Sequence, residues 1–488
     1  MNEIRDINEI KEEVLVKVCS LAFDGTLEEE AENIPYQMIP GIKPRFRCCV
    51  YREREIIRQR VRLAMGKLPA EAQYAELDPS QVVHVIPCAC EGCPIQRYTV
   101  TDNCQSCLAQ KCVKACRFGA ITKTSKGAVI DKDKCKKCGK CYEACPYNAI
   151  VDMERPCRRA CPVNAIQIDD NDIAIIDKDK CINCGNCVIG CPFGAVSDLS
   201  LITNVIDYLK NPELNVYAVA APAIEGQFRE ISIGQIKKGL KKLGFVGVYE
   251  AALGADAVAA EEAAELADCK STRKKLTSSC CPAFVDLIEK NYPELCDNVS
   301  SLLSPMAATA KYIREKIDNR AVIVFIGPCI AKKADVLQNH IGLISGVLTF
   351  QELSAMLKAK KVNLKEFELD SELATSFGKG FAKSGGVTAA VMKALEERGE
   401  VQPIAAQKCS GIAECKTALS LLKAGKLSED FIEGMACSGG CIAGPGIIGD
   451  PGLSRRTFDK KIDNRNNKII KNIHKYNFDT LNIHKHKR

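Results

Sequence analysis

Residues 135–146 read CKKCGKCYEACP, and residues 181–192 repeat the pattern as CINCGNCVIGCP. In each run, three cysteines at intervals of three residues precede a fourth cysteine and a proline. This spacing is typical of a chain that wraps a cubane 4Fe–4S cluster, whereas structural zinc sites favour isolated Cys-x-x-Cys pairs. Residues 86–200 hold 17 of the 29 cysteines, so we expect them to fold around clusters more than around a hydrophobic core.

The rest of the composition is that of a large globular protein. A length of 488 residues predicts several domains. No apolar run reaches the ~18 residues of a membrane helix, and the first ten residues are too polar for a secretory leader. A disulfide scaffold is the alternative use of so many cysteines, but such scaffolds are short and secreted. We expect a cytoplasmic protein without a membrane segment.

Patterning divides the chain into four regions. Residues 1–85 are mostly helical, with an amphipathic helix at Tyr51–Met65, and residues 86–200 form α+β ferredoxin-like domains. Residues 201–455 alternate strands with helices, which predicts an α/β domain with a mainly parallel sheet. Its expected strands are 216–220, 321–326 and 403–407, and its expected helices are 387–398 and 417–424.

The C-terminal region carries the charge. Residues 455–488 hold eleven Lys or Arg and three Asp, so the net charge of +7 comes from this end. A nucleic-acid or anionic partner is conceivable for such a segment. We instead expect residues 456–488 to be a solvated, flexible tail, with no nucleic-acid partner.

The cysteine runs predict a wire of clusters. In two-cluster ferredoxins the fourth cysteine of each run binds the other cluster. One cluster is therefore expected to take Cys104, Cys107, Cys112 and Cys145, and a second Cys116, Cys135, Cys138 and Cys141. A third is expected to take Cys161, Cys181, Cys184 and Cys187.

Two cysteines remain after these assignments. Cys157 and Cys191 lack a Cys-x-x-Cys pair beside them, and the spare pair is Cys90 and Cys93 upstream. We predict a fourth accessory cluster on these four cysteines, with Cys88 as the substitute for Cys90. The alternative is that Cys88–Cys93 binds zinc or nothing, which leaves three accessory clusters.

Three further cysteine segments lie in the α/β region: TSSCCPAF at 277–284, GPCIAKK at 327–333 and EGMACSGGC at 433–441. Four thiolates from distant segments can converge on one buried cluster, because ligands gather at the carboxyl ends of parallel strands. In order, spacing and flanking residues, the three segments resemble the signature motifs of iron-only hydrogenases. The first motif is similar to that of a less-studied branch.

This resemblance implies a fold of two lobes around an H-cluster, a 4Fe–4S cluster joined to a two-iron subsite with CO, cyanide and azadithiolate ligands. The implied cluster ligands are Cys281, Cys329, Cys437 and Cys441, and the last of these also bridges to the two-iron subsite. Lys332 is implied to hydrogen-bond a cyanide. The walls of the two-iron pocket are implied to include Met435, Phe381, Pro222 and Ala223.

A proton path is implied as well. Cys280, beside a ligand, matches the family's proton donor, and Glu262, Ser300 and Glu265 match its other relay positions. Taken alone, these residues would be an ordinary helix with a charged face. The sequence departs from the better-known members at Cys269, where an Arg usually ends the path, and at Met306 and Asp335.

The expected activity is reversible reduction of protons to molecular hydrogen, with electrons from ferredoxin or a similar low-potential carrier. Maturation proteins would build the two-iron subsite. One alternative is a hydrogen sensor with low turnover, although no signalling domain is evident. The other is a non-catalytic iron–sulfur scaffold protein, although such relatives lack parts of the two-iron pocket. Cys19, Cys296, Cys409 and Cys415 are expected to be buried small hydrophobes and not ligands.

Overall fold

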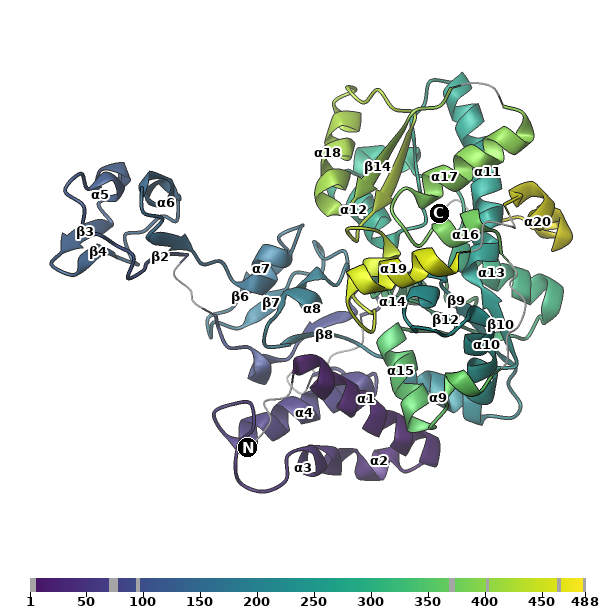
Figure 1. The fold of residues 1–488 in the computed structure, drawn as a ribbon, viewed down its shortest axis with the longest axis horizontal. Helices are drawn as coiled ribbons and strands as arrows, with labels where there is room; N and C mark the ends of the chain where they lie inside the picture. Colours follow the sequence, from purple (N-terminus) through teal and green to yellow (C-terminus); the bar gives the residue numbers. More distant parts are fainter. Residues whose placement is uncertain are drawn as a thin grey trace.

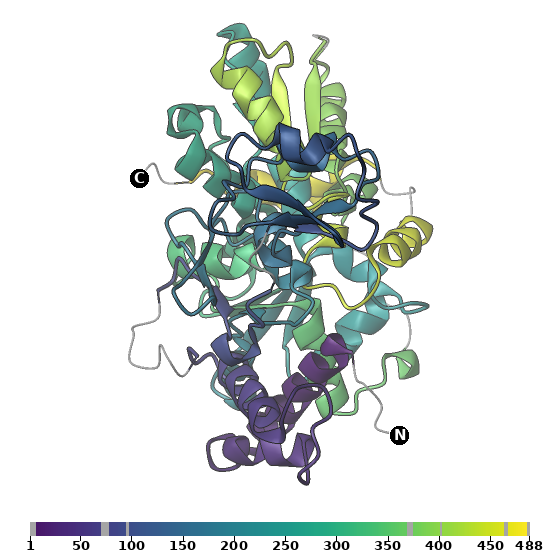
Figure 2. The ribbon, with the colours of Figure 1, turned by 90° about the vertical axis from the view of Figure 1, so that its left-hand side faces the viewer.

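The structure is a computed structural model that describes residues 6–69, 78–93, 97–367, 374–400, 403–462 and 467–485. N-terminal helices lie beneath a large two-lobed domain, and two small cysteine-rich units extend from its side (Figure 1). We name these units the outer unit, residues 97–153, and the inner unit, residues 83–93 and 156–198. The outer unit projects furthest and faces the viewer in Figure 2.

The N-terminal helices pack on the large domain. Helix α1 buries Ile10, Val14 and Val18, which recur at helical spacing, against α15, α9 and α4. The expected amphipathic helix is α4. The helices of this region and their two partners are α1 (Ile7–Asp24), α2 (Leu27–Glu30), α3 (Ile34–Met38), α4 (Val50–Ala64), α9 (Ile202–Lys210) and α15 (Phe350–Ala359).

The outer unit consists of two short helices beside two antiparallel strand pairs, β2 with β5 and β3 with β4. Its buried core is small: Tyr98, Ile121, Ile130, Cys141 and Ile150. Its elements are β2 (Tyr98–Val100), α5 (Lys111–Ala115), β3 (Ile121–Thr124), β4 (Gly127–Ile130), α6 (Lys140–Ala144) and β5 (Ile150–Asp152).

The inner unit repeats this plan, but its first strand comes from upstream of the outer unit. Strand β1 pairs antiparallel with β8, the last strand of the inner unit. The outer unit is therefore an insertion between two parts of the inner unit. The inner elements are β1 (Val83–Val85), α7 (Pro156–Ala160), β6 (Ile166–Ile168), β7 (Ala174–Ile176), α8 (Asn186–Gly190) and β8 (Val196–Asp198).

The lower lobe of the large domain holds a parallel sheet in the order β10-β9-β12-β13. Strand β9 is buried throughout, as expected of a central strand covered by helices on both faces. The strands are β9 (Val216–Ala220), β10 (Gly247–Glu250), β12 (Val322–Ile326) and β13 (Gly346–Leu348), and α10 (Ile233–Lys242) and α14 (Ala331–Asn339) lie among the covering helices.

The upper lobe holds a parallel sheet in the order β11-β15-β14. The strand expected at 403–407 begins later, at Ala406. The Ala405 amide donates to the Asp430 side chain, and pairing with β15 begins at Ala406, opposite Phe431. The elements are β11 (Leu276–Thr277), α12 (Pro282–Asn291), α16 (Ser376–Gly380), α17 (Gly386–Arg398), β14 (Ala406–Ser410), α18 (Ile412–Lys423) and β15 (Phe431–Met435).

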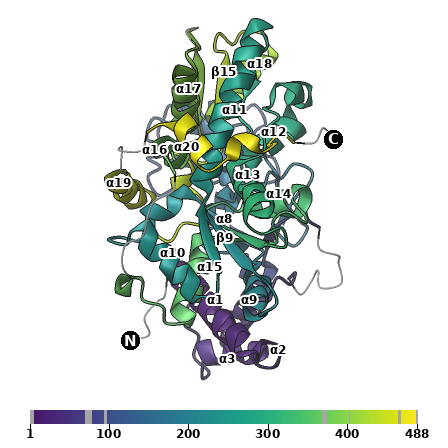
Figure 3. The ribbon, with the colours of Figure 1, turned by 90° about the vertical axis from the view of Figure 1, so that its right-hand side faces the viewer.

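The long helix α11 (Ala251–Ser271) packs closely against α13 (Pro305–Tyr312). Gly254 permits this approach, because a Cβ there would lie 2.4 Å from the Pro305 carbonyl oxygen. Helix α11 also contacts α17 and α20 (Ile469–Lys475), and Figure 3 shows α20 beside it.

The C-terminal region corrects one expectation. Residues 456–488 were predicted to be a flexible tail, but the described part of this region folds onto the large domain. Helix α19 (Pro451–Lys461) buries Phe458, and the Phe478 ring stacks on Tyr312 with centroids 4.4 Å apart. The prediction failed because it rested on the basic composition of this region and overlooked its apolar side chains. The following are buried in the core of the large domain: Ile469, Ile473, Phe478, Leu481 and Ile483.

No helix among the described residues is both long enough and apolar enough to cross a membrane.

Candidate functional site

A buried cavity of about 90 Å³ lies between the two lobes, and we call it the central cavity. Four cysteines line it from three segments: Cys281 at the start of α12, Cys329 after β12, and Cys437 and Cys441 after β15. These are the carboxyl ends of parallel strands, where α/β folds collect ligands. The structure thus brings together the four cysteines predicted to hold the H-cluster.

The central cavity is a poor environment for bare thiolates. Burial is the main cause that raises the pKa of Cys329 to about 11 and that of Cys441 to about 12. Positive iron offsets this penalty, because a metal ion deprotonates the thiols that bind it. A four-sulfur donor set in a dry cavity fits an iron–sulfur cluster.

Lys332 supplies a second sign that the central cavity takes a ligand. Its ammonium nitrogen is buried and has no hydrogen-bond partner among the described residues. The carboxylate of Asp335 is 3.7 Å away, and the Phe325 ring centroid is 5.9 Å away. An unsatisfied ammonium in an apolar pocket is costly, so its donors fit an anionic acceptor such as cyanide.

The remaining wall is largely apolar. All four predicted wall residues, Met435, Phe381, Pro222 and Ala223, line the central cavity. Met306 lines it as well, at a position where the sequence departs from better-known hydrogenases. Gly440 lets the cysteine-bearing loop fold back, because it has φ +97° and a Cβ there would lie 2.5 Å from the Ser384 nitrogen.

A line of polar groups leads away from the central cavity. Cys280 lines the cavity, and the charge of Glu262 acts on its thiol. Glu262 is fully buried; burial first, then Glu265 and Glu433, raise the pKa of its carboxyl to about 8. The Ser300 hydroxyl donates to Glu265 at 2.7 Å, and Glu265 is only half-buried. The four predicted relay residues therefore lead from the cavity toward solvent.

The outer unit gathers its cysteines in two small cavities. One is lined by Cys104, Cys107, Cys112 and Cys145, and the other by Cys116, Cys135, Cys138 and Cys141. These are the two predicted groups, including the exchanged fourth cysteines.

The inner unit gathers the other two predicted groups. Burial is the largest cause that raises the pKa of Cys181, Cys184 and Cys187, and the charge of Cys161 adds to it at all three, so Cys161 lies close to the other three thiols. A separate small cavity is lined by Cys90, Cys93, Cys157 and Cys191. Cys88 is not among the residues that line it, which favours Cys90 as the fourth member.

Sequence reasoning missed two features of these sites. Cys184 belongs to an inner group and also lines the central cavity, so the two sites adjoin. Glu433 is buried beside Glu262 and is held by amides of Gly385 at 2.7 Å and Thr388 at 2.9 Å. The spacing of residues in the sequence predicts neither the position of Cys184 at the central cavity nor that of Glu433 beside Glu262, because both depend on the packing of distant segments.

The remaining cysteines differ in exposure. Cys19, Cys409 and Cys415 are buried, as expected. Cys296 is exposed, so the expectation that it is a buried hydrophobe is wrong; it lies in a short surface turn after α12. Among the described residues, no group of three or more His, Cys, Asp or Glu forms a site for a single metal ion.

Comparison with known proteins matches three parts of the chain to protein families. Residues 214–445 match the family of iron-only hydrogenase large subunits, C-terminal domain. Residues 128–151 match a 4Fe-4S binding domain, and residues 155–195 match a 4Fe-4S dicluster domain.

Three curated relatives are hydrogenases. Iron hydrogenase 1 of Clostridium pasteurianum is 30% identical over 67% of this chain and 66% of its own length. The NADP-reducing hydrogenase subunit HndD of Solidesulfovibrio fructosivorans is 27% identical over 64% of this chain and 55% of its own length. The periplasmic Fe hydrogenase large subunit of Nitratidesulfovibrio vulgaris is 30% identical over 52% of this chain and 73% of its own length.

The matches therefore span from about half to three quarters of these relatives. A solved FeFe hydrogenase from Chlamydomonas reinhardtii is 22% identical with a TM-score of 0.49, over 57% of this chain and 94% of that chain.

Proposed function

The chain belongs to the iron-only hydrogenase family, and from this premise we propose that it interconverts protons, electrons and molecular hydrogen at the central cavity. One observation carries the proposal. Four cysteines, the Cys280 thiol and the Lys332 ammonium line the same buried space, and that ammonium has no hydrogen-bond partner in the part of the chain that the structure describes. An H-cluster bound there would supply the redox chemistry, while the protein supplies binding, orientation and electrostatics.

Each wall residue has a task in this proposal. Cys281, Cys329, Cys437 and Cys441 would hold the cluster, and Cys441 would also join it to the two-iron subsite. Lys332 would donate a hydrogen bond to a cyanide and lose its desolvation penalty. The apolar side chains of Met435, Phe381, Pro222 and Ala223 would exclude water.

The polar line would carry protons. Cys280 would exchange a proton with the reacting site and with the buried carboxyl of Glu262. A pKa of about 8 lets that carboxyl both hold and release a proton near neutral pH. Ser300 and Glu265 would connect it to the outside.

Electrons would travel along the cysteine groups. Cys184 lines the central cavity, so the cluster on Cys161, Cys181, Cys184 and Cys187 would be the last stop before the H-cluster. The insertion of the outer unit into the inner unit sets the two outer clusters at the far end of the wire. We propose that the cluster on Cys90, Cys93, Cys157 and Cys191 is a fourth accessory stop in the inner unit.

The electron carrier would meet the outer unit. Residues 97–153 carry eleven Lys or Arg and five Asp or Glu, a net charge of +6 before the negative charge of bound clusters is counted. A basic surface steers an acidic partner, which favours ferredoxin or a similar acidic low-potential protein. Reversing the charge of Lys136 and Lys137 should raise the KM for ferredoxin and leave turnover with a small-molecule reductant unchanged.

The test of the activity is infrared spectroscopy after maturation with an azadithiolate two-iron complex, together with measurement of hydrogen turnover. CO and cyanide bands with turnover support the proposal. Bands with very slow turnover would favour a hydrogen sensor. An absence of bands in a protein with full 4Fe–4S content would favour a scaffold.

The fourth accessory cluster has its own test. The full-length chain, reconstituted without the two-iron complex, should bind about 20 irons, from four accessory cubanes and the cubane of the H-cluster. Joint replacement of Cys90 and Cys93 by Ser should lower this to about 16 and remove one paramagnetic resonance signal. Cys88→Ser is the matched control and should change neither. A wild-type chain that saturates at about 16 irons would contradict the fourth cluster.

A further inference from the structure

The proposed proton path does not yet include a group that exchanges protons with solvent. Glu265 is the outermost of its four relay residues, and its carboxylate accepts the Ser300 hydroxyl at 2.7 Å and the Ser301 amide at 3.0 Å. Glu265 is half-buried, so a group that relays protons between water and its carboxylate would complete the path.

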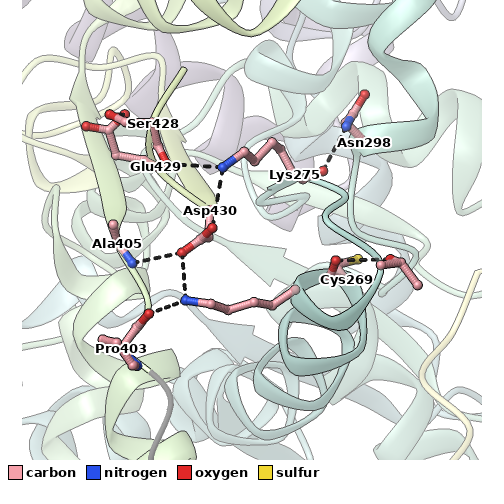
Figure 4. Close-up of polar contacts among 10 residues, drawn as sticks. Cys269, Lys275, Asn298, Pro403, Ala405, Ser428, Glu429 and Asp430 are labelled. Atoms are coloured by element: carbon pink, nitrogen blue, oxygen red, sulfur yellow. Dashed lines mark hydrogen bonds and ion pairs between the residues drawn. The ribbon is translucent and has the colours of Figure 1, made fainter. Parts of the chain in front are cut away.

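The end of helix α11 offers little for this task. Cys269, one turn beyond Glu265, is buried, and burial and the Glu265 charge raise the pKa of its thiol. Two neighbouring ammonium groups are committed to Asp430, which lies 3.1 Å from Lys270 and 3.4 Å from Lys275. Figure 4 shows Asp430 between Lys275 and the backbone of Ala405.

The C-terminal segment contacts Ser301, whose amide donates to the same carboxylate. Leu302 and His484 form an antiparallel bridge, with backbone hydrogen bonds from Leu303 to Ile483 and from Lys485 to Ser301, both 2.8 Å long. Buried Ile483 anchors the segment. This pairing brings the His484 Nδ1 atom to 2.9 Å from the Ser301 hydroxyl, while the His484 residue is exposed to solvent.

We propose that His484 is the residue through which protons enter the path. Its protonated ring donates to the Ser301 oxygen, and the Ser301 hydroxyl passes its own proton through one bridging water to the Glu265 carboxylate, which the Ser301 amide holds at 3.0 Å. Water or buffer then returns a proton to the ring. Each transfer moves one proton and changes no redox state. The sequence would run in reverse when hydrogen is consumed.

Imidazole suits this position because a protonated ring has two donor nitrogens, so one can donate to Ser301 while the other exchanges with water. His484 is part of the C-terminal segment that docks on the large domain. The backbone pairing of this segment holds the His484 ring against Ser301. Lys485, the next residue, adds positive charge that acts on Glu262. The C-terminal segment would therefore take part in proton transfer.

The test rests on the proposed hydrogenase activity and uses the full-length matured enzyme with a small-molecule reductant. His484→Gln should lower turnover by about a hundredfold, the lower end of what a proton-transfer group contributes, and increase the solvent deuterium isotope effect. Imidazole added to the buffer should restore much of the turnover. The infrared bands and thermal unfolding should match those of the wild type.

His474→Gln is the matched control, because His474 is an exposed histidine of the same region that pairs with Asp479 at 3.0 Å. Unchanged turnover of His484→Gln in an active enzyme would overturn the inference, as would a loss that imidazole does not rescue. Should His484→Gln unfold, Ser301→Ala keeps the backbone pairing and must show the same loss of turnover. A wild-type enzyme without turnover would instead refute the proposed function itself.

Discussion

The outer unit and the central cavity both surround one space with four cysteines, but their supports differ. The outer unit buries only a handful of side chains, and its Cys138 is exposed. The central cavity is walled by strand ends and helices of the two largest hydrophobic clusters of the described chain. In the outer unit the clusters hold the fold, whereas at the central cavity the fold holds the cluster.

Removal of iron should separate the two regions most strongly. We expect the iron-free chain to lose protection from hydrogen exchange throughout residues 97–153, while β9, β12 and β15 keep theirs. The reason is that metal binding supplies the folding free energy of a unit with so small a core. Exchange mass spectrometry on iron-free and reconstituted protein measures this. Equal protection of the outer unit in both forms would break the comparison.

A pair of ligand replacements sharpens the same contrast. Cys141→Ser in the outer unit should cause local unfolding, because Cys141 is both a ligand candidate and a core residue. Cys437→Ser should leave the fold of the central cavity intact and remove only the H-cluster. Limited proteolysis distinguishes them, since only the first should create a new cleavage site within residues 97–153.

Cys280→Ala tests whether turnover at the central cavity can be lost while the fold and the bound cofactor are kept. Turnover should fall by a factor of ~10² to 10⁴, because a proton-transfer group typically contributes that much. Iron content and infrared bands should stay at wild-type values. Cys296→Ala, at an exposed cysteine, is the control. Full activity in Cys280→Ala would mean that protons use another route.

Glu262 gives the central cavity a dependence on pH that the outer unit should lack. Its pKa is about 8 in the folded chain, against 4.5 for an ordinary glutamate. Between these values the folded state keeps a proton that the unfolded state releases, so stability falls as pH rises from about 4.5 to 8. The whole change is on the order of 3–5 kcal/mol.

Glu262→Gln should remove most of this fall, since a glutamine does not titrate. Thermal unfolding of the large domain across pH 5–8, for both proteins, measures the difference. Parallel curves would show that Glu262 does not carry this dependence.

Lys332→Ala should have the smallest effect. Retention of the two-iron subsite should weaken by about 1–3 kcal/mol, the cost of leaving a buried anionic ligand without its donor. The 4Fe–4S clusters should remain. Infrared band intensity per iron measures retention, and Lys333→Ala is an unsuitable control because Lys333 pairs with buried Glu352 at 2.9 Å. Lys383→Ala, at an exposed pair with Asp459, serves better.

Local patterns predicted much of this molecule. Strand β9 has the bounds predicted for it, and α17 differs from its predicted span by one residue. The cysteine groups of the outer unit followed from spacing, because each ligand run is continuous in sequence. The grouping of Cys90 with Cys157 could be reached only by counting unpaired cysteines.

Features that depend on tertiary packing were beyond such patterns. The C-terminal residues read as a solvated tail, because lysine and asparagine outnumber the few apolar side chains that pack on α11 and α13. His484 lies beside Ser301 only because those side chains dock the segment. No spacing in the sequence relates residue 484 to residue 301.

The insertion of the outer unit also sets an order of events during synthesis. The eight cysteines of the outer unit all lie in one stretch of sequence, residues 104–145. This unit can therefore acquire iron as soon as it leaves the ribosome. Cys90 and Cys93 emerge earlier, yet their proposed partner Cys191 is made nearly a hundred residues later. The nascent chain must therefore keep the thiols of Cys90 and Cys93 free of other ligands while the outer unit binds its clusters. Cluster insertion would begin with the two clusters of the outer unit.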